Sequence, residues 1–172
     1  MALNFALSSD TKIQVVITAD ESVQSDDETR RVYLDTGDAS LLHISEGATW
    51  FTLKALSPAE RLQAEINAGA HTRSELGRHL AEQRSEYSGE ARARWHHALT
   101  DDERTAVADY DAYIESCYLE TVRAGLVCIE GHDGDAFEVL QSIRPEGVRQ
   151  LAIVELACHI QRLSLLGADQ KK

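Results

Sequence analysis

The sequence predicts an α+β fold, in which a small N-terminal antiparallel β-sheet of about four strands packs on a predominantly α-helical C-terminal body. Two observations predict it. In residues 51–55, apolar and polar residues alternate with the period of two that is typical of half-buried strands. After residue 57, apolar residues recur every three or four positions, which is the period of an amphipathic helix. We therefore expect a sheet subdomain over residues 1–56 and a helical body over residues 57–172.

Four short segments are predicted as strands. Residues 12–19 are rich in β-branched residues and bounded by polar residues, and residues 49–56 include the alternating segment. The other two, residues 30–36 and 40–45, flank a turn. The sequence GDA between the second and third segments predicts a hairpin that turns near Gly37 and Asp38. The charged segment Asp20 to Thr29 predicts an exposed loop or flexible arm, which could help an edge strand of the sheet pair with a neighbouring molecule.

The change from strand to helix falls within the segment WFTLKALSPAERLQAEI, residues 50–66. Ser57 matches a helix N-cap, Pro58 the first helical position, and Glu60 completes an S-x-x-E capping box. The first helical segment is expected to run from Pro58 to about residue 86, with breaks at Gly69 and Gly77.

Further helices follow from the same kinds of signal. A second capping box, Thr100 to Glu103, predicts the start of a long helix that ends near Val127. The other expected helices are a short one within EARARWHHAL, one over residues 136–143, and a last one from Pro145 to about Leu166. From residue 151 to residue 160 the last helix is apolar except at Glu155 and His159, so we expect it to be either the central helix or part of a subunit interface.

The 172-residue chain carries 29 acidic and 17 basic residues, a net charge of -12. A nucleic-acid binder needs clustered Lys and Arg, and an anionic membrane would repel this chain, so we expect neither partner. The N-terminal residues lack the basic start and unbroken apolar run of a signal peptide, and no stretch approaches the roughly 18 apolar residues of a membrane span. Three cysteines without C-x-x-C spacing suit reduced thiols in a cytosolic setting.

Two groups of residues have the composition of a metal site. Glu155 and His159 lie four apart on one helix face and, with His132 or Asp133, could form the centre of a small metal-dependent hydrolase. The alternative is a hydrogen-bonded network, continued by Arg162, that satisfies the polar groups of an apolar helix.

The segment GHDGDAFE is the second group. Its His132, Asp133, Asp135 and Glu138 offer ligands for a hard cation such as calcium, without the spacing of an EF-hand. The alternative is a turn at Asp133 and Gly134, followed by Asp135 as the N-cap of the next helix. We find no sequence signature of a nucleophilic or phosphate-binding site, and we expect neither a cofactor nor an enzymatic activity.

Residues 71–98 form the one locally basic region of this acidic chain, and they include the repeated His71, Glu75 and His79. Such a region can dock an acidic partner surface or a second copy of the chain; the alternative is a solvated face. The residues predicted to contact a partner are Arg78, Arg84, Arg92, Arg94, Trp95, His96 and His97, together with Ile153 on the last helix.

Two segments carry a resemblance to a known group of proteins. The C-terminal VELACHIQRLSLLGADQKK, residues 154–172, resembles the C-termini of small proteins encoded among the head and tail genes of tailed bacteriophages, and WFTLKALSPAERLQAE, residues 50–65, is similar to the strand-to-helix joint of such proteins. The resemblance implies a non-enzymatic virion component or assembly accessory. Its partners would be other virion proteins or copies of itself, and it would be located in the virion or the host cytoplasm.

The sequence leaves two other functions as alternatives: the metal-dependent hydrolase described above, and a cytosolic ligand-binding or regulatory module.

Overall fold

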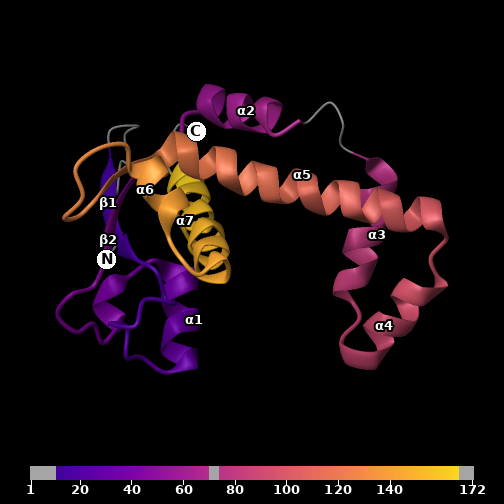
Figure 1. Ribbon diagram of the computed structural model, residues 1–172, viewed down its shortest axis with the longest axis horizontal. Helices are drawn as coiled ribbons and strands as arrows, with labels where there is room; N and C mark the ends of the chain where they lie inside the picture. The colour runs from indigo at the N-terminus through magenta and orange to yellow at the C-terminus, as the bar shows by residue number, and fades with distance from the viewer. Residues whose placement is uncertain (1–10, 70–73, 167–172) are drawn as a thin grey trace. The chain divides into compact units, whose positions relative to one another are not determined.

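The computed structural model describes residues 11–69 and 74–166, and it confirms an α+β fold (Figure 1). Three strands, β1 (Lys12–Val16), β2 (Trp50–Lys54) and β3 (Leu126–Ile129), form an antiparallel sheet in the order β1-β2-β3. The helices, in chain order, are α1 (Asp27–Thr36), the 3-10 turn η1 (Ala39–Leu41), α2 (Pro58–Asn67), α3 (Glu75–Ser85), α4 (Gly89–Ala98), α5 (Asp101–Gly125), α6 (Ala136–Ser142) and α7 (Glu146–Leu166).

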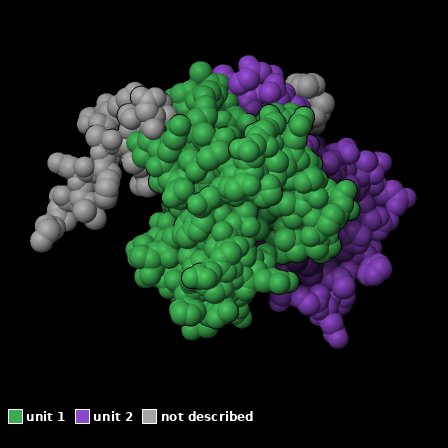
Figure 2. All heavy atoms as spheres, turned by 60° about the vertical axis from the view of Figure 1, so that its left-hand side comes forward, with its two compact units in different colours: residues 1–61, 121–172 green, residues 62–120 purple. Residues whose placement is uncertain are grey.

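The chain forms two compact units (Figure 2). Unit 1 comprises residues 1–61 and 121–172, and therefore holds the sheet with α1, α6 and α7. Unit 2 comprises residues 62–120 and holds α3, α4 and most of α5. The units do not divide at residue 56, because β3 comes from beyond the long helix and completes the sheet.

The middle strand of the sheet has one buried face. β2 pairs with β1 from Trp50 opposite Val16 to Lys54 opposite Lys12, and its Phe51 and Leu53 are fully buried. β2 pairs with β3 through Phe51 opposite Ile129, and the register shifts at Leu53. The alternation that predicted a strand in this segment therefore reflects a real division between core and solvent faces.

The predicted strands over residues 30–36 and 40–45 are wrong. The first lies in α1, and the second contributes only η1 and a single bridge between Ile44 and Val23. Helix signals at both ends outweigh the alternating pattern: the Asp26 side chain accepts a hydrogen bond from the Thr29 backbone N–H, and Gly37 ends the helix with a φ of 72°. The expected hairpin at Gly37 is accordingly a helix C-cap.

The expectation of an exposed loop or flexible arm over Asp20 to Thr29 is only partly correct, because exposed residues such as Glu21 and Gln24 flank a buried one. Val23 is 2% exposed and belongs to a core cluster with Val16, Tyr33 and Leu42. The Asp20 carboxylate holds this segment in place, because it accepts hydrogen bonds from the backbone N–H groups of Ser22 and Thr49. These bonds lower the pKa of Asp20 although burial opposes them.

Both predicted capping boxes are confirmed. The Ser57 N–H donates to Glu60 Oε2 at 2.8 Å and the Glu60 N–H donates to Ser57 Oγ at 3.3 Å. The same reciprocal pair joins Thr100 and Glu103, at 2.8 and 3.3 Å. The predicted break after the first of these helices is confirmed near Gly69, because α2 ends at Asn67.

Gly77 lies inside α3 and does not break it, because α3 needs a glycine there to approach α5. A Cβ at this position would lie 2.0 Å from the carbonyl oxygen of Ala106. Beside this crossing, Leu80, Leu99 and Val107 form the core cluster of unit 2.

We predict that Gly77→Ala lowers the melting temperature although alanine is the better helix former. The added methyl group must push α3 away from α5, at a cost of about 1 to 3 kcal/mol, which exceeds the gain of about 1 kcal/mol in helix propensity. Gly147→Ala in the first turn of α7 is the matched control, because a Cβ there has no atom within 4 Å. Thermal unfolding followed by circular dichroism should show a decrease for Gly77→Ala alone, and equal effects would contradict the close approach.

Candidate functional site

Helix α7 is the central helix of unit 1. Ala152, Leu156, Ala157 and Ile160 are fully buried, and α7 packs against β2 and α1 (Figure 1). The two polar residues of this segment are buried as well, Glu155 at 9% and His159 at 1% exposure. Their polar atoms therefore need partners within the protein.

Both hydrogen bonds to Glu155 come from Thr18, which lies two residues after the end of β1. The Thr18 backbone N–H donates to Glu155 Oε2 at 2.7 Å, and the Thr18 hydroxyl donates to Oε1 through a short hydrogen bond. Burial raises the pKa of Glu155, while the two bonds from Thr18 and the positive charge of Arg30 act to lower it. The carboxylate thus fastens the end of β1 to α7.

His159 is held by Arg162, one turn further along α7. An Arg162 Nη2–H lies 2.6 Å from His159 Nδ1, and because a guanidinium can only donate, Nδ1 must be the acceptor. The neutral ring then carries its proton on Nε2, a buried atom for which the described residues provide no hydrogen-bond partner. The Tyr33 ring lies beside the imidazole, with 5.1 Å between ring centroids. Burial, helped by the charge of Arg162, lowers the pKa of His159 to about 4.

The same arginine connects α7 to the end of α1. Arg162 Nη1 donates to the Leu34 carbonyl oxygen at 2.7 Å, which satisfies an end carbonyl of α1. Gly37 leaves room for this contact, since a Cβ there would overlap the guanidinium. Tyr33 completes the network, because its hydroxyl donates to the Val16 carbonyl and accepts from the Val16 N–H. Burial raises the pKa of Tyr33 to about 12.

The hydrogen-bonded network, one of the two alternatives for Glu155 and His159, is therefore what the structure contains. Among residues 11–69 and 74–166, no three His, Cys, Asp or Glu side chains lie close enough to hold a metal ion, so His132 and Asp133 do not complete a site with Glu155. In the GHDGDAFE segment, Asp135 is the N-cap of α6, as its turn alternative predicted: Oδ1 accepts from the backbone N–H groups of Phe137 and Glu138.

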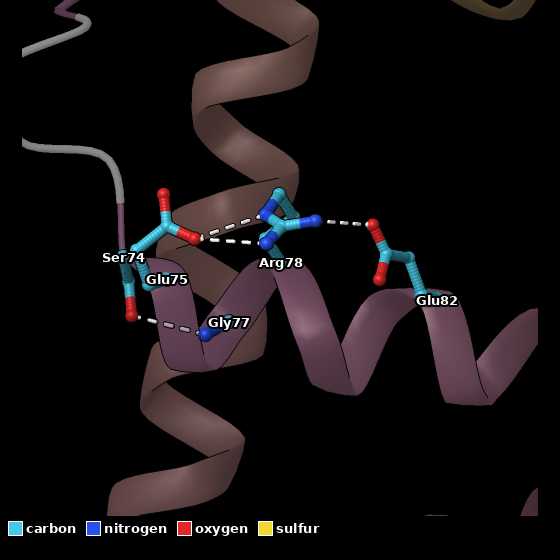
Figure 3. Close-up of polar contacts among 5 residues, drawn as sticks. All are labelled: Ser74, Glu75, Gly77, Arg78 and Glu82. Atoms are coloured by element: carbon cyan, nitrogen blue, oxygen red, sulfur yellow. Dashed lines mark hydrogen bonds and ion pairs between the residues drawn. The ribbon is translucent and has the colours of Figure 1, made fainter.

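The basic region lies in unit 2, where two of its arginines are already paired. Arg78 donates to Glu75 at 3.0 Å and to Glu82 at 2.7 Å, all on α3, whose N-cap Ser74 accepts from the Gly77 N–H (Figure 3). Arg84 donates two bonds to Asp111 of α5, at 2.6 and 2.7 Å. Arg84 therefore joins α3 to α5, whereas Arg78 pairs only within α3, and the charge of both is largely neutralised in place.

Helix α4 carries the unpaired charge of this region. It has no buried residue, and Arg92, Arg94, His96 and His97 are exposed. Arg92 and Arg94 form no ion pair with any residue in the described part of unit 2, unlike Arg78, Arg84 and Arg104. We call Arg92, Arg94, His96 and His97 the α4 cationic surface; its charge comes from the two arginines.

Trp95 faces the other way and anchors α4 to the rest of unit 2. It is partly buried, packs against the cluster of Leu80, Leu99 and Val107, and stacks on Tyr87 with 6.4 Å between ring centroids. The anchor gives α4 a defined position although the helix has no buried residue of its own.

The outward side of α7 is apolar. Ile153, the predicted contact residue, is partly buried, whereas Leu151, Val154 and Leu165 are 57%, 40% and 58% exposed. The sequence did not single out these three, because an almost wholly apolar helix does not reveal which side faces solvent.

A separate open hollow of about 400 Å³ in unit 2 is lined by Ala68, Asp109, Ala112, Tyr113 and Ser116.

Comparison of the chain with protein-family models, with curated proteins and with solved structures gave no match. No helix within the described residues has the length and apolar character needed to cross a membrane. The residues and their contacts are therefore the basis for a functional proposal.

We predict that Thr18→Val lowers the free energy of unfolding by about 1 to 3 kcal/mol, because it leaves a buried carboxylate oxygen without its hydroxyl donor. Thr18→Ser keeps the hydroxyl and should lose less stability. Urea titration of both variants measures the difference, and equal losses would show that the hydroxyl bond to Glu155 contributes nothing.

The His159 imidazole should make stability depend on pH. The unfolded histidine protonates near its ordinary value of 6.5, whereas the folded one stays neutral down to about 4. The unfolded chain binds more protons between these values, so the free energy of unfolding should fall as pH decreases from about 6.5 to about 4, by up to about 3 kcal/mol.

The His159→Asn variant isolates this contribution, because its amide oxygen can still accept from Arg162 but cannot be protonated. Urea titrations at about pH 7 and about pH 5 should show a smaller decrease in the variant than in the wild type. The raised pKa of Glu155 acts in the opposite direction above its ordinary value of 4.5 and is present in both proteins. Identical pH dependence would contradict a neutral buried His159.

Proposed function

We propose that this protein is a non-enzymatic structural or assembly subunit that acts through protein–protein contacts, with the α4 cationic surface as its main docking element. The observation that carries the proposal is the exposure of unpaired Arg92 and Arg94 on a chain whose net charge is -12. The resemblance of residues 50–65 and 154–172 to bacteriophage head and tail proteins suggests the setting, a virion component or a tail assembly accessory.

Charge and rigidity support a docking role for α4. Arginine is weakly hydrated and forms two-pronged bonds with carboxylates, so it is well suited to contacts with acidic protein surfaces. Complementary charge speeds encounter and selects partners. Because Trp95 fixes the helix from its inner side, binding does not have to order the α4 backbone, and mainly the exposed side chains lose conformational freedom.

We predict that the double variant Arg92→Glu, Arg94→Glu weakens self-association of the purified protein at least about tenfold, because like charges then meet at the contact. Native mass spectrometry and sedimentation velocity over a range of concentrations measure the change. The melting temperature should stay close to that of the wild type, since neither side chain makes an ion pair within the described residues.

The matched control reverses two exposed cations elsewhere, Lys12→Glu with Arg31→Glu in unit 1, and changes the net charge by the same amount. We expect this control to associate nearly as well as the wild type. If both double variants lost association equally, net charge alone would explain the effect, and a wild type that stayed monomeric at every concentration would also contradict the proposal.

A further inference from the structure

A second charged surface lies in unit 1, on the loop between β3 and α6. Its four acidic residues, Glu130, Asp133, Asp135 and Glu138, are all exposed. Asp135 is occupied as the N-cap of α6, but the other three carboxylates accept no hydrogen bond and form no ion pair with the described residues. The sequence contains no Lys or Arg from residue 124 to residue 143. We call these four residues the acidic loop.

Several other acidic residues of the described chain pair with a basic residue. Glu60 pairs with Lys54, Asp111 with Arg84, and Glu146 with Arg149. At the start of α5, Asp101 pairs with Arg104. At the start of α1, the acidic residues are followed in the sequence by Arg30 and Arg31. The acidic loop carries the charge opposite to that of the α4 cationic surface. Neither surface forms an ion pair with the described residues of its own unit.

Both surfaces are held in defined positions. The Asp135 cap fixes the start of α6, and Gly131 and Gly134 adopt φ values of 76° and 118° that make the turns of the loop. An ordered backbone on both surfaces lowers the conformational entropy that is lost when they meet, so that mainly the exposed side chains have to be fixed.

We infer that the acidic loop of one copy docks on the α4 cationic surface of a second copy of this chain. This inference rests on the proposed function and identifies the partner. The second copy is favoured because the chain itself supplies an unpaired surface of each sign. The two surfaces are different, so the contact is heterologous and repeats head to tail, which produces a closed ring or an open filament. Opposite charges at an exposed contact are screened by salt, so added NaCl should dissociate the assembly.

Mixing two charge-reversed variants tests this pairing. The α4 variant, Arg92→Glu with Arg94→Glu, carries acids on both surfaces. The loop variant, Glu130→Lys with Asp133→Lys, keeps the arginines of α4 and gains two lysines in the loop beside Asp135 and Glu138. The Asp135 cap is left intact so that α6 keeps its N-cap. Each variant alone should associate at least about tenfold more weakly than the wild type, and an equimolar mixture should recover assembly because both contacts are again between opposite charges.

A matched control adds Asp27→Lys and Glu28→Lys, two exposed positions at the start of α1, to the α4 variant itself, which changes its net charge as much as the two loop lysines would. We expect this control to stay dissociated, whereas the α4 variant that carries Glu130→Lys and Asp133→Lys in the same chain should associate again. Equal recovery would show that bulk charge drives association, and it would overturn the inference. Circular dichroism melting confirms that every variant is folded.

The remaining outcomes separate this inference from the proposed function. If the α4 variant dissociates but the loop variant assembles like the wild type, the docking role of α4 stands and the acidic loop is not its partner. If neither variant changes assembly, both proposals fail. If each variant dissociates and the mixture stays monomeric, the two surfaces do not pair between copies and the inference is overturned.

Discussion

Unit 1 depends on the burial of an apolar helix that carries two polar side chains. Because α7 is buried on most sides, Glu155 and His159 must find partners inside the protein. Thr18 provides one set at the end of β1, and Arg162 provides the other while it also binds the end of α1. The same bonds that satisfy α7 thereby hold the sheet and α1 against it.

Charged side chains in this protein fall into two groups with different roles. Pairs such as Arg84 with Asp111 join elements of one unit and are partly shielded from solvent. The arginines of α4 and the loop acids other than the cap residue Asp135 contribute no such bond, so their removal should leave each unit folded. A chain of net charge -12 can stay soluble through its acids and still associate where its few unpaired cations are displayed.

The candidate contact surface could be predicted from the sequence only as a region. Clustering of arginine and histidine over residues 71–98 was visible, and α4 lies within it. Which arginines remain unpaired was not visible, because Asp111 lies 27 residues from Arg84 in the sequence and meets it only when α3 packs on α5. Trp95 is similar: its inward position follows from the core that surrounds it, which the sequence alone does not specify.

The sequence by itself determined the α+β class and the starts of α2, α5 and α6, because an N-cap and the backbone N–H groups that it receives lie within a few residues of one another. Only the tertiary structure decided that β3 completes the sheet and which side of α7 faces solvent. Both depend on partners far away in the chain, such as Phe51 for Ile129 and β2 for α7. Short apolar segments satisfy either a helix or a strand locally, so the distant partner makes the choice.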